Sequence, residues 1–144
     1  MKIIDLEPGD PRLAAVLPVL RELRPHLTED LFHDVYAEGH RQGLRFTAAF
    51  ADDGNAERCL GVAGWRVVVN TSTLRMLYVD DLVAAEAERS AGVGRALLTR
   101  LEERARELGC HELSLDSGTQ RTEAHRFYFR ERLTVTAFHF DKQL

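Results

Sequence analysis

Residues 89–94 combine residue types that could bind an anion. They read Arg-Ser-Ala-Gly-Val-Gly and stand directly before a strongly helical run. The unpaired backbone N–H groups at the start of a helix attract anions, and glycines there let a phosphate come close to the backbone. Arg89 and Arg95 can add charge-assisted hydrogen bonds. We therefore predict that this glycine loop binds a phosphate, although the glycines could also serve only to turn the chain.

Two other phosphate-binding motifs do not fit the glycine loop. A dinucleotide fingerprint needs a third glycine or an alanine, but the residue at that position is Leu97. A Walker loop would continue with Gly-Lys-Ser/Thr, and no such tripeptide follows. A nucleotide-binding Rossmann protein therefore comes last among the three protein classes that the sequence leaves open.

The segments on both sides of the glycine loop alternate between strand-like and helix-like patterns. Strands are predicted at residues 2–6, 44–50, 58–69, 72–84, 111–116 and 133–140. Helices are predicted at 11–23, from Thr28 to Gly39 or Gly43, at 92–108 and at 120–131. Pro18 predicts a kink or a break in the first helix. The inner side of the second helix is predicted to consist of Leu31, Phe32, Val35 and Tyr36. The order β-α-α-β-β-β-α-β-α-β predicts an α/β (α+β) fold with one mixed central sheet flanked by helices. The strands between residues 44 and 84 form two hairpins in series, and the glycine loop lies in a parallel crossover.

The composition is that of an ordinary globular protein. The 144 residues are 44% hydrophobic and 29% charged, which predicts a single domain over residues 1–144. The net charge of −4 and the lack of a Lys/Arg cluster with interleaved aromatics argue against a nucleic-acid partner. No segment is apolar enough to predict a leader peptide or a membrane span. Cys59 and Cys110 lack metal-ligand spacing, so we predict no metal, reduced cysteines and a cytoplasmic location.

Three features of the chain together resemble the GCN5-related N-acetyltransferase (GNAT) family. The glycine loop resembles the family's Arg/Gln-x-x-Gly-x-Gly/Ala loop. Residues 77–83, Leu-Tyr-Val-Asp-Asp-Leu-Val, resemble its splayed central strand, and residues 124–128, Ala-His-Arg-Phe-Tyr, resemble its Ala-x-x-Phe-Tyr signature. The order of the elements fits from end to end, so the resemblance covers essentially the whole chain.

The chain departs from the family pattern at four places. Arg121 stands where many members have asparagine, and Ala85 replaces a common proline after the central strand. Arg132-Leu133 replaces the usual Gly-Phe. The chain ends after the strand predicted at 133–140, so a seventh strand is missing or comes from a partner subunit. A homodimer is an expectation from the family alone.

The resemblance implies that acetyl-CoA is the cosubstrate. The backbone of Leu82, Val83 and Ala84 would pair with the pantetheine arm as with an added strand. The pyrophosphate would be held by the glycine loop and the residues beside it, namely Arg89, Ser90, Ala91, Gly92, Val93, Gly94 and Arg95.

Asp80 and Asp81 are the candidate bases for acetyl transfer to an amine. A primary amine has a pKa of roughly 10.4 and an aspartate one of about 3.9, so an ordinary carboxylate cannot simply remove the proton. Resemblance to polyamine acetyltransferases implies that Asp80 faces the acceptor and acts as the base. Alternation along a strand predicts that Asp81 faces the other side, where it would bond backbone or a helix, and that Tyr78 shares the face of Asp80.

Tyr128 is the candidate proton donor to the departing sulfur. A phenol with a pKa near 10 is protonated at neutral pH, but a thiolate near 8.5 is the weaker base, so a hydrogen bond to the sulfur is expected rather than full transfer. Four residues lie where the family usually shapes acceptor specificity, namely Arg24, His26, Glu29 and Tyr36. Each of them could instead be a surface or packing residue.

The sequence thus predicts an acetyl-CoA-dependent N-acetyltransferase. Its acceptor would be the primary amine of a small molecule, which attacks the thioester directly. A peptide or protein amino group is the second substrate class. A non-catalytic acyl-CoA-binding sensor or interaction module is the alternative from another class, because it would need neither Asp80 nor Tyr128.

Overall fold

The computed structural model describes residues 1–54 and 58–144. Asn55, in the connection between the strands predicted at 44–50 and 58–69, lies outside the described residues. The chain divides into two compact units, Met1–Ser114 and Leu115–Leu144. The single domain over residues 1–144 stays a prediction.

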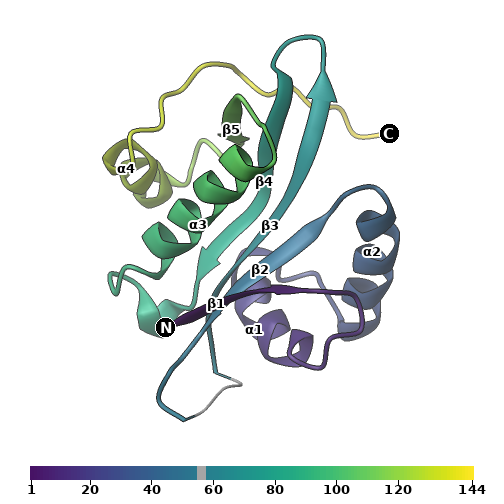
Figure 1. Cartoon of the computed structure of the whole chain (residues 1–144), viewed down its shortest axis with the longest axis vertical. Coiled ribbons are helices and arrows are strands. Elements are labelled where there is room, and N and C mark those ends of the chain that lie inside the picture. Colours follow the sequence, from purple (N-terminus) through teal and green to yellow (C-terminus); the bar gives the residue numbers. More distant parts are fainter. Residues whose placement is uncertain (55–57) are drawn as a thin grey trace. The chain divides into compact units, whose positions relative to one another are not determined.

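One mixed sheet of five strands forms the framework, and its strands follow one another in chain order. They are β1 (Lys2–Leu6), β2 (Arg45–Phe50), β3 (Cys59–Asn70), β4 (Leu74–Ala84) and β5 (Glu112–Leu115). β1, β2, β3 and β4 pair antiparallel, so the two predicted hairpins in series are confirmed (Figure 1). The predicted fold class is confirmed as well.

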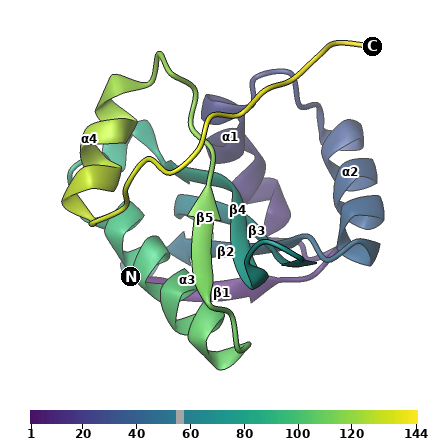
Figure 2. The ribbon, with the colours of Figure 1, turned by 90° about the horizontal axis from the view of Figure 1, so that it is seen from above.

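Helices cover both faces of the sheet in the first unit. α1 (Leu13–Leu23) and α2 (Glu29–Arg41) lie on one side and α3 (Val93–Glu107) on the other (Figure 2). Each side has its own cluster of buried apolar residues. Pro18 lies inside α1 without ending it, so the early break that we allowed there is not found.

α2 begins at the predicted residue, but fewer of its side chains are buried than the sequence predicted. The Thr28 side chain accepts a hydrogen bond from the Leu31 amide at 3.1 Å and so caps the helix. Phe32 and Tyr36, one helical turn apart, are buried, whereas Leu31 and Val35 are 42% and 44% exposed. The prediction that Leu31 and Val35 lie on the inner side is therefore wrong, because a single row of large aromatic rings fills the space above the sheet.

Tyr36 joins α2 to the sheet through its hydroxyl, which donates to the Leu6 carbonyl and accepts from the Phe46 amide at 3.4 Å. Burial raises the pKa of Tyr36 to about 12. We expect Tyr36→Phe to lower the free energy of unfolding by about 1–2 kcal/mol, because buried backbone groups lose a partner. Urea unfolding measures this, with the exposed Val35→Ala as control; equal losses in both variants would contradict it.

The segment after α4 (Thr122–Arg130) is not a strand. Residues 133–140 have the alternating pattern that predicted one, but the structure assigns them no helix or strand. Val135, Phe138 and Phe140 are 74%, 84% and 90% exposed. A strand exists only through pairing with another, and the second unit has no complete strand of its own. The predicted last strand is therefore wrong for this chain by itself.

Candidate active site

The glycine loop has a backbone shape that only glycine adopts easily. A short 3₁₀ turn, Glu86–Glu88, leads into it, and α3 begins directly after Gly92. Gly92 has φ +83°, in the left-handed region, and no side chain caps the helix it precedes. A β-carbon built on Gly92 would meet nothing within 4 Å. The backbone angle therefore favours glycine at this position, and the space beside it is open.

Only part of the glycine loop has backbone amides available to a ligand. The amides of Arg89 and Ala91 donate to the carbonyls of Glu86 and Glu88 at 3.3 and 3.1 Å. Within residues 1–54 and 58–144, no acceptor is found for the amides of residues 92–94. These three N–H groups open the first turn of α3, where the helix itself offers them no acceptor. Of the anion site expected over residues 89–95, the amides of Arg89 and Ala91 are thus already bonded. The amide of Ser90 and those of residues 92–94, which open α3, have no acceptor among the described residues.

The side chains around the glycine loop are charged and exposed. Arg89 is 63% exposed and lies 3.8 Å from Glu22 and 3.9 Å from Glu86. Glu88 pairs with Arg58. Exposed ion pairs at these distances are worth little, so an incoming phosphate can take Arg89 at small cost.

The C-terminal end of β4 has a free edge. Ala85 donates to the Leu60 carbonyl of β3 at 2.9 Å, and the register then directs the N–H and C=O of Val83 toward β3 as well. The backbone groups of Leu82 and Ala84 point the other way. β5 begins beside the opposite end of β4, where the His111 amide donates to the Arg75 carbonyl at 2.8 Å. Since β5 has four residues, it stops short of residues 82–84.

A β-bulge brings the two aspartates of β4 to the same face. Gly64 of β3 lies opposite Asp81 and Trp65 opposite Val79, which leaves Asp80 as an extra residue. The Asp81 carboxylate lies over Gly64, and Asp80 bonds the side chain of Arg66, two residues further along the regular strand β3. Our prediction that successive residues place Asp80 and Asp81 on opposite faces is therefore wrong, because alternation fails at a bulge.

Two arginines hold the acid pair, as we call Asp80 and Asp81. Arg24 donates from Nε to Asp81 Oδ1 at 2.7 Å and from Nη2 to the Asp80 carbonyl at 3.1 Å. Arg66 donates from Nε to Asp80 Oδ2 at 2.9 Å. The Asp80 side chain is 25% exposed and that of Asp81 14%. Sequence reasoning did not single out Arg66, although a lone charge within an apolar strand was a signal that could have identified it.

Burial raises the pKa of Asp81 above its ordinary value of 3.8, against the opposing effect of the Arg24 guanidinium. The folded protein therefore holds this proton more tightly than the unfolded chain does. The stability that follows from this is present below pH 3.8 and is lost as the pH rises through the folded-state pKa.

The raised pKa of Asp81 predicts how the stability of the protein depends on pH. The free energy of unfolding of the wild type, minus that of Asp81→Asn, should fall as the pH rises from 3.8 toward neutrality. Urea unfolding across that range measures it, with the exposed Asp30→Asn as control. A difference that rises with pH would mean that Arg24 outweighs burial.

Tyr128 lies in the second unit, on α4. The side chain is half-buried, and burial raises its pKa, while the nearby Arg121 guanidinium acts in the opposite direction. The hydroxyl is therefore protonated at neutral pH. Arg121, which departs from the family pattern, is thus a neighbour of the tyrosine that we predicted to be catalytic.

The residues predicted on the acceptor side lie in different surroundings. Tyr36 is a packing residue, and Arg24 lies at the acid pair. His26 and Glu29 are exposed, with Glu29 at 3.9 Å from His33. Tyr78 lies opposite Arg66 in the β3–β4 ladder.

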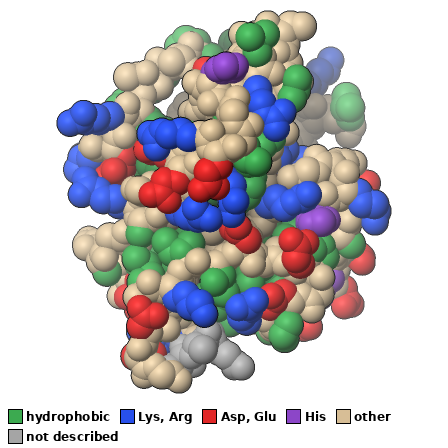
Figure 3. Space-filling view, viewed as in Figure 1, with side chains coloured by type: hydrophobic (Ala, Val, Ile, Leu, Met, Phe, Trp, Pro, Cys, Tyr) green, Lys and Arg blue, Asp and Glu red, His purple; other side chains and the backbone are tan. Residues whose placement is uncertain are grey.

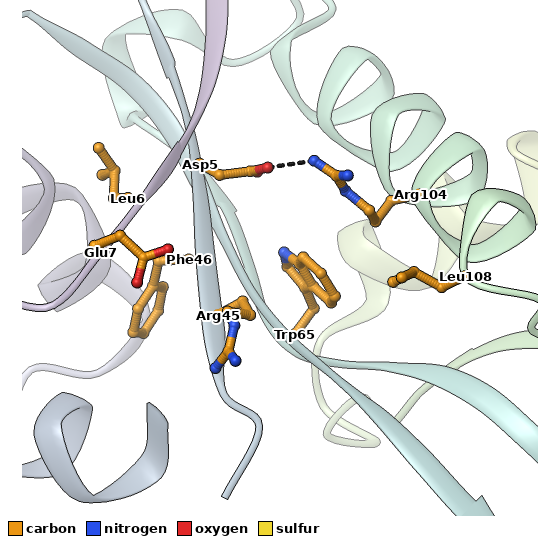
Figure 4. A pocket seen from close by; sticks show the side chains of 8 residues that line it. All are labelled: Asp5, Leu6, Glu7, Arg45, Phe46, Trp65, Arg104 and Leu108. Carbon is orange, nitrogen blue, oxygen red and sulfur yellow. Dashed lines mark hydrogen bonds and ion pairs between the residues drawn. The ribbon is translucent and has the colours of Figure 1, made fainter. Parts of the chain in front are cut away.

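A cavity of about 210 Å³ lies elsewhere in the first unit (Figure 4). Asp5 pairs with Arg104 at its rim and accepts from the Thr47 hydroxyl at 2.6 Å, and Thr47 accepts in turn from Trp65 Nε1 at 2.9 Å. None of the predicted site residues lines this cavity, and its charged lining residues already have partners: Glu7 pairs with His40, and Arg45 donates to the carbonyls of His40 and Leu44.

The described residues contain no group of three or more His, Cys, Asp or Glu arranged to hold a metal ion. In the same part of the chain, no helix is both long and apolar enough to cross a bilayer. Acidic and basic side chains lie interspersed on the face seen in Figure 3.

Comparison with known proteins agrees with this geometry. The family model described as Acetyltransferase (GNAT) family matches residues 13–133. An uncharacterized N-acetyltransferase of Bacillus subtilis, YhdJ, is 32% identical over 127 residues, which are 87% of each chain. An aminoalkylphosphonate N-acetyltransferase of Salmonella typhimurium is 36% identical over 66 residues, 46% of this chain and 43% of the relative. The crystal structure of a Trypanosoma brucei acetyltransferase has the same fold, with a TM-score of 0.79, 22% identity and 99% of each chain covered.

The fold is thus that of an acetyltransferase. It combines a free sheet edge, a bulged acid pair and a glycine turn that leads into a helix. The chain is a member of the GNAT family. It is an N-acetyltransferase, and enzymes of this family use acetyl-CoA.

Proposed function

We propose that this chain transfers the acetyl group of acetyl-CoA to the primary amine of a small molecule by direct attack on the thioester. The observation that carries the proposal is the arrangement along β4. Within one stretch of chain, the acid pair is followed by the free edge at Leu82 and Ala84 and then by the three amides of residues 92–94.

The donor fits these groups. The outward backbone groups of Leu82 and Ala84 can pair with the amides of a pantetheine arm, as an added strand would. The amides of residues 92–94 suit a pyrophosphate, because they lie at the positive end of α3 and no side chain caps them. Arg89 can leave its weak ion pairs to join them.

Asp80 is the proposed base. It is more exposed than Asp81 and is bonded by Arg66 through one nitrogen, so an ammonium group can replace Arg66 there. Asp80 takes a proton from the ammonium, directly or through water, and the neutral amine attacks the thioester carbonyl. The C–N bond forms, the C–S bond breaks, and Tyr128 donates a hydrogen bond to the thiolate that leaves.

A small-molecule acceptor is supported by the Salmonella relative, whose name gives an aminoalkylphosphonate as its substrate. A peptide amino group and a non-catalytic acyl-CoA-binding module are the alternatives. A cytoplasmic location and a homodimer are further proposals; the exposed apolar segment 133–140 supports the homodimer, which sedimentation can test.

A screen of amines with acetyl-CoA, read as release of free thiol, tests the proposed function. Turnover of small amines supports it. Turnover of peptides alone would assign the second substrate class, and binding of CoA without turnover of any acceptor would assign the binding module.

Matched glycine substitutions at the two ends of α3 test the phosphate site. Gly92 and Gly109 have φ +83° and +71°, and a β-carbon on either would meet nothing within 4 Å. Gly92→Ala and Gly109→Ala should therefore lose similar stability, about 1–2 kcal/mol. Only Gly92→Ala should weaken CoA binding in calorimetry, by roughly 10-fold for one charge-assisted hydrogen bond. Equal CoA affinity in the two variants would remove the phosphate from this site.

A further inference from the structure

The charges of the acid pair are balanced by two arginines, because each carboxylate has its own guanidinium partner. Arg24 bonds Asp81 and the Asp80 carbonyl, and Arg66 bonds the Asp80 carboxylate. Arg24 thus bonds the backbone of Asp80, and Arg66 bonds its side chain. An acceptor amine that reaches Asp80 arrives near two positive charges.

Both arginines have N–H donors to spare. Arg66 uses Nε alone, and Arg24 uses Nε and Nη2. For the Arg66 Nη groups and Arg24 Nη1, no hydrogen-bond acceptor is found among residues 1–54 and 58–144. The side chains are 28% and 45% exposed, so these donors are accessible. Guanidinium groups with free Nη donors are well suited to carboxylate, sulfonate or phosphonate oxygens.

The arginines also determine which amines fit. An ammonium that pairs with Asp80 displaces Arg66 and leaves its guanidinium without a partner, which is costly in a partly buried site. An acceptor with an anionic group supplies the missing partner, so that every charge stays paired. A diamine instead brings a second positive charge toward Arg24 and Arg66.

Resting on the proposed function, we propose that Arg24 and Arg66 select zwitterionic acceptors, in which the primary amine is accompanied by an anionic group. The amine pairs with Asp80, and the anion binds the free Nη donors of the two arginines. This inference opposes the polyamine-like acceptor that the acid pair alone would suggest.

Three acceptors with the same aminopropyl chain test the inference: aminopropanesulfonate, aminopropanol and diaminopropane. The wild type should show the highest kcat/KM with the sulfonate and the lowest with the diamine. Arg66→Gln and Arg24→Gln should each reduce the sulfonate-to-alcohol ratio of kcat/KM roughly 10-fold, mainly through KM. Arg106→Gln, an exposed arginine at the end of α3, is the matched control and should keep the wild-type order.

Different results would contradict the selection of zwitterionic acceptors and the proposed acetyltransferase activity. If all three amines turn over with the diamine best, or if the arginine variants leave the ratio unchanged, the inference is wrong and the acetyltransferase proposal stands. Calorimetry with the CoA-loaded protein supplies a readout without turnover. Binding of the sulfonate that depends on Arg66, with no acetylation, would support the anion site and overturn the proposed function. If none of the three amines binds or reacts, the inference is wrong, and the screen of amines decides on the proposed function.

Discussion

Asp80→Asn is expected to lower kcat/KM for amine acceptors by about 100- to 10,000-fold, while CoA affinity stays about the same. General-base assistance is worth this much, and asparagine keeps the shape of the side chain without its basicity. The loss should shrink as the pH approaches the amine pKa, roughly 10.4, because the acceptor then loses its proton without help. Rates of thiol release from neutral pH upward measure both effects.

Asp81→Asn is the matched comparison, since it removes the neighbouring carboxylate from the same bulge. Its effect on kcat/KM should be smaller, because Asp81 is more buried and is held by Arg24. If Asp81→Asn causes the larger loss, the base is Asp81, whose pKa burial raises. If the loss at Asp80 is the same at every pH, that residue has a structural role instead.

Tyr128→Phe is expected to reduce kcat by roughly 10- to 150-fold and to leave CoA affinity unchanged. The hydroxyl donates a hydrogen bond to a developing thiolate, and bonds to charged groups are worth about 1.5–3 kcal/mol. Because its pKa is raised, the phenol keeps its proton and stabilises the sulfur as a donor. Stopped assays of thiol release under saturating substrates isolate kcat.

Phe129→Leu is the control for packing on α4, since Phe129 is the next residue and is 58% exposed. It should retain activity. If Tyr128→Phe and Asp80→Asn both match the wild type at a negligible rate, the chain is a binding module. If only Tyr128→Phe matches an active wild type, water or another group stabilises the sulfur.

The elements that the sequence predicted well are those with local causes. α3 followed from its apolar period and from the glycines at its two ends, and the Thr28 cap followed from its side chain. Propensity is also local, which is why it misled us at residues 133–140. Those residues alternate as a strand does, but pairing depends on a partner elsewhere.

The part of the site that the sequence could not predict is the register of β4. Nothing in Val79-Asp80-Asp81 itself shows that one residue is extra; the bulge exists only relative to Gly64 and Trp65 of β3. The glycine at position 64 leaves room for the Asp81 carboxylate, with a β-carbon there only 3.0 Å from it. Arg66 follows from the same register and Arg24 from the place where α1 ends, so both partners became visible only in three dimensions.

Trp65 is the only tryptophan in the chain; the residue is 6% exposed, and its indole N–H donates to the Thr47 hydroxyl. Its emission therefore comes from one known place in the first unit. On unfolding, the indole passes into water and the spectrum shifts to the red. Fluorescence can thus follow the melting of residues 1–114 alone, while the signal from peptide circular dichroism includes α4. A difference between the two midpoints would reveal whether the halves of this enzyme unfold together.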